Sequence, residues 1–135
     1  MFQQFDRLAA FLADVASLTS VTELIVAERD RNVVGVVGYT APHRPREKIF
    51  PPEWAVVRIL SVLPSERGRG VGRLLTQACI DCARRDGVAI LGLHTSPVMR
   101  SALDLYLRMG FVFHSSIADR MGAPYALYTL DVRKT

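Results

Sequence analysis

The sequence predicts a single α/β domain, because strand-like and helix-like segments follow one another along most of the chain. Two apolar runs of strand length, residues 54–62 and 88–95, each precede a segment whose apolar residues recur at helical spacing. Nearer the N-terminus, two strand-like runs flank a short polar turn. With 135 residues, 50% of them hydrophobic and 22% charged, the chain has the size and composition of one compact domain, residues 1–135.

Composition also limits the compartment and the partners that we expect. No apolar run approaches the roughly 20 residues of a membrane span, and charged residues interrupt the apolar region that an N-terminal signal peptide would need. The formal net charge of +4 favours anionic ligands but does not by itself indicate nucleic acid. We therefore expect a cytoplasmic protein that binds neither a membrane nor nucleic acid.

The first 40 residues predict a helix followed by a hairpin. The helix has an apolar stripe that consists of Phe5, Leu8, Ala9, Leu12, Val15 and Ala16. Residues 22–28 and 33–40 then read as two antiparallel strands around a polar turn at residues 29–32. Gly35 and Gly38 weaken the second strand and indicate a β-bulge there.

Residues 41–53 predict a loop, because four prolines remove backbone donors that a strand would need. The loop is also basic, since it contains His43, Arg44, Arg46 and Lys48. At the other end of the chain, residues 111–115 predict a short strand, residues 116–124 a turn-rich connection and residues 125–132 a final strand.

The segment after residues 54–62 predicts a phosphate-binding turn. The strand breaks at Leu63-Pro64 and leads into Arg67-Gly68-Arg69-Gly70-Val71-Gly72, after which a helical pattern begins. Glycines at a helix N-terminus let several backbone N–H groups face one anion, and Arg67, Arg69 and Arg73 add positive charge. A diphosphate would suit this turn. Neither the P-loop pattern nor the G-x-G-x-x-G dinucleotide pattern fits it.

The spacing Arg67-x-x-Gly70-x-Gly72 instead resembles the coenzyme A loop of the GNAT acetyltransferases. A second motif strengthens the resemblance, since residues 102–111, which read Ala-Leu-Asp-Leu-Tyr-Leu-Arg-Met-Gly-Phe, match the family pattern A-x-x-L-Y-x-x-x-G-F. Together the two motifs extend the resemblance to about residues 19–132. It implies a GNAT-like mixed, largely antiparallel central sheet with helices on both faces.

The resemblance also implies a function, the transfer of an acetyl group from acetyl-CoA to an amine by direct attack. It assigns Tyr106 as the general acid that protonates the leaving thiolate. Many relatives have a glutamate base early in the central strand, but Val56 occupies that position here, so Glu53 is a candidate base and His94 another. The expected coenzyme contacts are Leu60, Ser61, Val62, Arg67, Gly68, Arg69, Gly70, Val71, Gly72 and Arg73.

Two further departures from the family pattern lie elsewhere. Only about 20 residues precede the hairpin, so the usual first strand is expected to be missing, and a homodimer could cover the resulting edge. Met99 stands where many relatives have an asparagine that contacts the coenzyme, and Ser96 or Ser101 could replace that contact. Because the glutamate is absent, a catalytically inactive CoA-binding module for sensing or assembly is the alternative function.

The acceptor is not identified by these motifs and could be a small molecule or a protein amine. The resemblance places loop 41–53 near the acceptor site, where its positive charge would suit an anionic acceptor, and a solvated loop is the alternative. Cys79 and Cys82 form a C-x-x-C pair about two turns inside a helix, which favours packing over redox chemistry. The histidine spacings match no zinc pattern, so no metal is expected.

Overall fold

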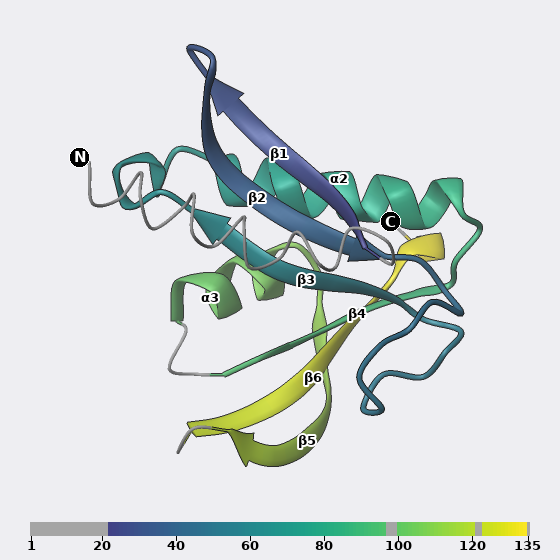
Figure 1. The fold of residues 1–135 in the computed structure, drawn as a ribbon. Helices are drawn as coiled ribbons and strands as arrows, with labels where there is room; N and C mark the ends of the chain where they lie inside the picture. Colours follow the sequence, from purple (N-terminus) through teal and green to yellow (C-terminus); the bar gives the residue numbers. More distant parts are fainter. Residues whose placement is uncertain (1–21, 97–99, 121–122, 135) are drawn as a thin grey trace.

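The computed structural model describes residues 22–96, 100–120 and 123–134. Within these residues, six strands form one sheet in the order β1-β2-β3-β4-β6-β5 (Figure 1). The strands are β1 Glu23–Arg29, β2 Asn32–Thr40, β3 Ala55–Val62, β4 Ile90–Thr95, β5 Val112–Arg120 and β6 Ala123–Asp131. Only β3 and β4 are parallel, and every other neighbouring pair is antiparallel. This confirms the α/β class and the mixed, largely antiparallel sheet.

Two α-helices of the described residues cover one face of the sheet. They are α2 Val71–Arg85 and α3 Arg100–Arg108, and two short 3-10 helices are η2 Pro64–Glu66 and η3 Val132–Lys134. The apolar side of α2 and the inward side of α3 share one buried cluster with strands β2, β3, β4 and β6. The helix predicted near the N-terminus lies outside the described residues. The expectation that the first strand of the family is missing also concerns those residues.

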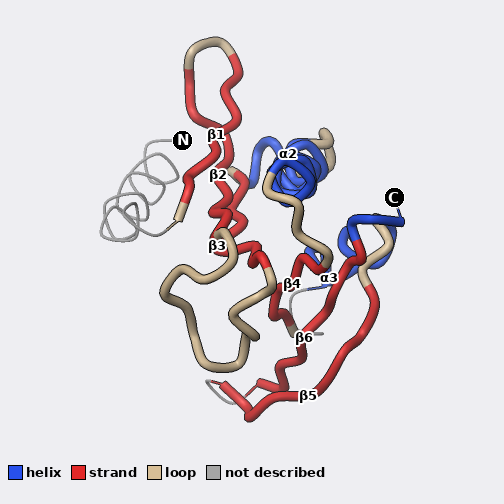
Figure 2. Tube along the Cα trace, turned by 90° about the vertical axis from the view of Figure 1, so that its right-hand side faces the viewer, coloured by secondary structure: helices blue, strands red, loops and turns tan. Residues whose placement is uncertain are grey.

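The opposite face carries the loop of residues 41–54, which connects β2 to β3 (Figure 2). Phe50 and Trp54 from this loop are buried against Val56 of β3 and Leu127 of β6 in a second cluster. Trp54 covers Gly92, where an added Cβ would meet the indole ring at 2.5 Å. The loop predicted from its prolines is therefore a packed cover of the sheet.

The structure corrects the expectation for residues 116–124. Residues 116–124 are not a turn-rich connection, because β5 continues to Arg120 and pairs with Ala123 of β6. The sequence of residues 116–124 indicated a loop because it is polar, and polar residues are tolerated in β5, an edge strand whose described side chains are largely exposed.

None of the helices in the described residues has the length and apolar character that crossing a membrane would need.

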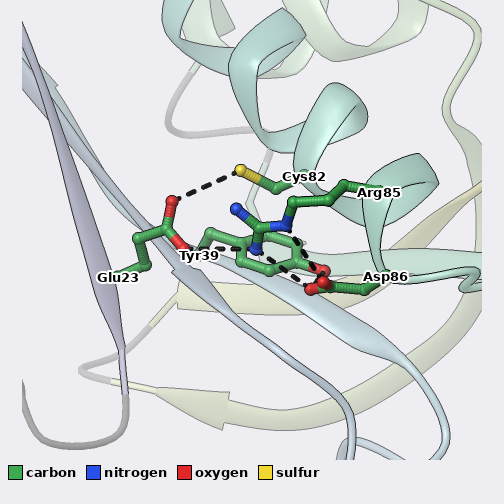
Figure 3. A network of polar contacts seen from close by, with 5 residues as sticks. All are labelled: Glu23, Tyr39, Cys82, Arg85 and Asp86. Carbon is green, nitrogen blue, oxygen red and sulfur yellow. Dashed lines mark hydrogen bonds and ion pairs between the residues drawn. The ribbon is translucent and has the colours of Figure 1, made fainter.

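A polar network ties the C-terminal end of α2 to the first hairpin (Figure 3). The Tyr39 hydroxyl donates to Asp86 at 2.8 Å, and Arg85 bonds both Asp86 and Glu23. The guanidinium of Arg85 also lies 5.9 Å from the centre of the Tyr39 ring, within cation–π range. The Cys82 thiol donates to Glu23 at 3.6 Å. The network therefore joins three elements that are distant in sequence.

This network gives the first prediction, which concerns stability. Asp86 accepts hydrogen bonds from Arg85 and Tyr39, which hold the pKa of its carboxyl below the ordinary value. Tyr39→Phe should lower the free energy of unfolding by about 1 kcal/mol at neutral pH, whereas Tyr128→Phe should change it little. The loss should shrink as the pH falls through the lowered pKa of Asp86, where the charge-assisted bond disappears. Urea unfolding at pH 7 and at a series of acidic pH values measures both effects, and a loss that stays constant across the whole series would contradict the role of Asp86.

The two cysteines behave as packing residues. Cys79 is fully buried and unbridged, and burial raises the pKa of its thiol to about 12. Burial also raises the pKa of Cys82, and the neighbouring Glu23 carboxylate adds to the effect. Both thiols therefore stay protonated at neutral pH, which opposes the thiolate chemistry of a redox pair.

Candidate functional site

The candidate site begins with a β-bulge in the centre of the sheet. Between two ladder pairs, Val36 with Ser61 and Gly38 with Arg58, β2 advances two residues while β3 advances three. The extra residue is thus in β3, where Ile59 has a φ of +53°. A β-branched residue rarely adopts positive φ, so the surrounding ladder must hold it there. The bulge predicted in β2 exists beside Gly35, since β2 advances two residues and β1 only one between the pairs Ala27 with Gly35 and Glu28 with Val33, which leaves Val34 as the extra residue. Beside Gly38, by contrast, the strand that bulges is the partner β3.

The same strand has an unpaired edge on its other side. β3 pairs with β4 only at Ala55 with Leu91 and Val56 with Gly92. Beyond these pairs the two parallel strands diverge toward the end of the sheet where α2 begins (Figure 1). The last residues of β3, Leu60, Ser61 and Val62, therefore have no β4 partner and can offer main-chain groups to an extended ligand.

The glycine-rich turn follows this open edge. Gly68 and Gly70 have φ values of +77° and +84°, and an added Cβ at either would meet nothing within 4 Å. Gly70 is the residue that caps α2, and no side chain bonds the first turn of the helix. The N–H groups of Val71, Gly72 and Arg73 precede the first helical donor, since Leu74 N–H is the one that bonds Gly70 carbonyl. A helix N-terminus that lies beside open space, and whose first N–H groups bond no side chain, favours the binding of an anion.

The arginines of the turn are not equivalent. Glu66, which is 9% exposed, forms an ion pair with Arg69 at 3.7 Å and another with Arg29. Arg67 and Arg73 are exposed and have no ion pair with a carboxylate of the described residues. The net positive charge at the start of α2 therefore comes mainly from these two side chains.

Gly72 has a reason of its own to be glycine. An added Cβ would lie 3.2 Å from the Leu105 side chain of α3. The first turn of α2 therefore packs closely on α3, and this contact brings the second sequence motif against the first. The sequence alone suggested ligand approach as the reason for this glycine.

Tyr106 lies on the buried side of α3. Its side chain is 6% exposed, and its ring lies 5.6 Å from that of Phe111. Burial raises the pKa of its phenol well above the ordinary value, and Cys79 adds a smaller effect. The phenol is therefore protonated at neutral pH and can serve as a proton donor.

His94 projects to the opposite face, under the loop. Its ring stacks on Phe50 at 5.9 Å and meets the edge of Tyr125 at 5.6 Å. Its Nε2 lies 3.7 Å from the Glu47 carboxylate, and the two side chains are 30% and 34% exposed. Glu47 attracts a protonated imidazole, so this pair can accept a proton.

The other candidate bases are placed differently. Glu53 is exposed at the end of the loop, just before β3 begins. Val56 is 1% exposed and packs in the second cluster, so no carboxylate occupies this position on the face that carries His94. Of Glu53, Val56 and His94, only His94 is both titratable and partly buried. It also lies next to the point where β3 and β4 diverge.

Arg46 holds the loop in its position. Its guanidinium donates to the carbonyls of Ala41 at 2.7 Å and Pro51 at 3.0 Å, and also to those of Arg44 and Trp54. A cation that bonds four backbone carbonyls fixes the loop from both ends. The sequence suggested a general positive charge here, but the structure gives Arg46 this anchoring role.

The remaining expected contacts are only partly described. Met99 lies outside the described residues, Ser96 is fully buried, and Ser101 is exposed on α3. In the described ranges, no group of three or more histidine, cysteine, aspartate or glutamate residues could hold a metal ion. Sequence reasoning did not identify Ile59 or Glu47, since the ladder and the loop packing that give them a role involve distant segments.

Comparisons with known proteins identify the family of the chain. A family model described as the acetyltransferase (GNAT) family matches residues 3–111. The chain is 34% identical over 100 residues to L-2,4-diaminobutyric acid acetyltransferase from Nocardia farcinica, which covers 73% of this chain and 44% of that protein. It is 41% identical over 54 residues to streptothricin acetyltransferase from Streptomyces lavendulae, covering 40% of this chain and 29% of that protein. The match thus spans less than half the length of these relatives.

Solved structures share the fold. The structure of yncA from Salmonella typhimurium with its cofactor acetyl-CoA superposes with a TM-score of 0.67 at 20% identity, over 94% of this chain and 73% of that chain. An acetyltransferase of the GNAT family from Streptococcus pneumoniae gives a TM-score of 0.68 at 21% identity, over 90% and 72% of the two chains.

Proposed function

Because the chain belongs to the acetyltransferase (GNAT) family, we propose that it transfers the acetyl group of acetyl-CoA to an amine by direct attack. One observation carries this proposal: the end of β3 has an unpaired edge, and a few residues later α2 begins with N–H groups that no side chain caps. An extended ligand with a diphosphate at one end can use both. The acetyltransferases among the relatives, and the fold shared with an acetyl-CoA complex, support the same cofactor.

The proposed coenzyme contacts follow the chain. The first-turn N–H groups of α2, with Arg67 and Arg73, bind the diphosphate, while Arg69 contributes less charge because it shares Glu66. The pantetheine lies along Leu60 to Val62, where β3 has no neighbour. Gly68 and Gly70 let the diphosphate approach the backbone, because no Cβ intervenes.

The reaction then needs three functions near the bulge. The amine nitrogen attacks the thioester carbonyl, and main-chain N–H groups at the bulged part of β3 stabilise the oxyanion that forms. As the C–S bond breaks, Tyr106 gives its proton to the leaving thiolate. The burial that keeps this phenol protonated also disfavours a thiolate beside it, so proton transfer accompanies bond cleavage.

The attacking amine must lose a proton, and we assign this role to His94 acting through a water molecule. Glu47 lies 3.7 Å from Nε2 and stabilises the imidazolium that results. Glu53 is the alternative base, but its side chain is exposed at the start of β3. Neither residue supplies a carboxylate at the position of Val56, which is why the inactive CoA-binding module is kept as the second candidate function.

Thiol release from acetyl-CoA in the presence of a panel of amines tests the proposal. We expect release that depends on the amine and equals the amount of acetylated product found by mass spectrometry. Tight CoA binding without thiol release for any amine would favour the inactive module.

The homodimer stays a prediction. The exposed Val112 and Phe113 on edge strand β5 would provide a surface for it.

A further inference from the structure

Arg58 of β3 occupies the face of the sheet that lies away from α2. The preceding residues alternate, with Ala55 and Val57 buried in the cluster beneath α2 and Val56 in the cluster beneath the loop. Arg58 pairs regularly with Gly38 and continues this alternation. Its side chain therefore starts on the same face as Val56, one residue before the bulge at Ile59.

His94 lies at the same level on the neighbouring strand. Val56 and Gly92 form the last pair between β3 and β4, and Arg58 and His94 each follow two residues later. Because Leu91 and Leu93 are buried beneath α2, His94 projects to the face that carries the loop. Arg58 and His94 thus flank the point where the two strands diverge, with the bulge beside them.

The charge of Arg58 is not neutralised by the described part of the chain. Arg29, Arg85 and Arg133 each form an ion pair with a carboxylate, but no such pair is found for Arg58 among the described residues. Its side chain is nevertheless half-buried, where a lone guanidinium is costly. Glu47, an acidic residue of the loop on this face, pairs with His94.

From this arrangement we propose that the acceptor is a small amine that also carries a carboxylate, with the carboxylate on Arg58 and the amine beside His94. A guanidinium binds a carboxylate through two parallel hydrogen bonds, which also orients the molecule. Adjacent strands lie about 4.8 Å apart where they are paired, so both groups of an amino acid can be reached at once. This inference rests on the proposed acetyl transfer and names its substrate class.

The loop on this face has a small net positive charge, since Arg44, Arg46 and Lys48 outnumber Glu47 and Glu53. Arg44, Arg46, Glu47 and Lys48 line one surface pocket of this loop together with Phe50. A net positive potential raises the local concentration of anionic acceptors. A simple diamine would meet unfavourable charge from both the loop and Arg58.

Matched acceptor pairs test the inference. The pairs are L-alanine with ethylamine, L-lysine with cadaverine and L-phenylalanine with phenethylamine, so that each amino acid is compared with the amine that lacks its carboxylate. We expect kcat/KM to be at least about 10-fold higher for the amino acid of any pair that reacts, in line with a charged hydrogen-bonded contact. In Arg58→Met, this preference should disappear through a rise in the KM of the amino acid, with the KM for acetyl-CoA unchanged. Arg58→Lys should keep part of it.

The control variant is Arg31→Met, which removes an exposed arginine from the β1–β2 turn and should leave every ratio unchanged. Calorimetric titration of the CoA-saturated protein with the same pairs separates recognition from chemistry. Amino acid binding that depends on Arg58 but is not followed by turnover would uphold the substrate class and overturn the transferase activity. Equal or better use of the amines, or an Arg58→Met effect that is the same for both members of a pair, would overturn the inference while acetyl transfer stands.

Discussion

A Gly70→Asp variant is expected to bind CoA at least about 100-fold more weakly than the parent protein, a loss of about 2.7 kcal/mol. The new side chain would enter open space, since nothing lies within 4 Å of an added Cβ. Its carboxylate would lie at the N-terminus of α2 and accept hydrogen bonds from the first-turn N–H groups that we assign to the diphosphate. It would therefore compete with the coenzyme by both position and charge.

The matched control is Gly87→Asp. Gly87 follows α2 at its other end, has a φ of +68° and likewise has nothing within 4 Å of an added Cβ. Both variants place an L-residue in the left-handed region, at a cost of about 1–2 kcal/mol. The new carboxylate is favourable at the N-terminus of α2 and unfavourable near its C-terminus, so Gly87→Asp should be the less stable of the two. Calorimetric titration with CoA should then distinguish them, because only the variant at residue 70 should lose affinity. If both bind CoA as the parent does, the diphosphate does not lie at the start of α2.

Tyr106→Phe is expected to lower kcat by about 10²-fold or more, while the dissociation constant of CoA changes little. The substitution keeps the ring that packs near Phe111 and removes only the hydroxyl group. The parent phenol is held protonated by burial, which raises its pKa. Chemistry should thus be impaired without loss of binding.

The measurement combines steady-state turnover with CoA titration for the parent and the variant, using an acceptor found in the amine panel. Tyr125→Phe is a suitable comparison, because its ring meets His94 on the opposite face and should leave thiolate protonation unaffected. Turnover must be assayed where the chemical step limits the rate. Unchanged kcat under those conditions would return Tyr106 to a packing role and leave solvent to protonate the thiolate.

The sequence alone determined the parts of this protein that depend on local pattern. Hydrophobic periodicity located the first hairpin, strands β3 and β4, and helices α2 and α3, and proline content identified residues 41–53 of the loop that ends at residue 54. Such patterns are readable because side chains repeat every two residues in a strand and every 3.6 in a helix. The two motifs, around Gly70 and Tyr106, indicated the family for a similar reason, since each is a short stretch of fixed spacing.

Only the tertiary structure decided which distant residues share a site. The glycines of β2 indicated a bulge, but only the pairing shows that Val34 of β2 is the extra residue beside Gly35 and that β3 has the extra residue beside Gly38, because a bulge is a property of the pairing of two strands. β5 proved longer than its polar sequence suggested, since an edge strand needs no apolar outer surface. Arg58, His94 and Glu47 lie on one face because of the parallel register of β3 and β4 and because of a loop anchored by Arg46. No local spacing encodes these relations, because they arise only when segments 10 to 50 residues apart pack together.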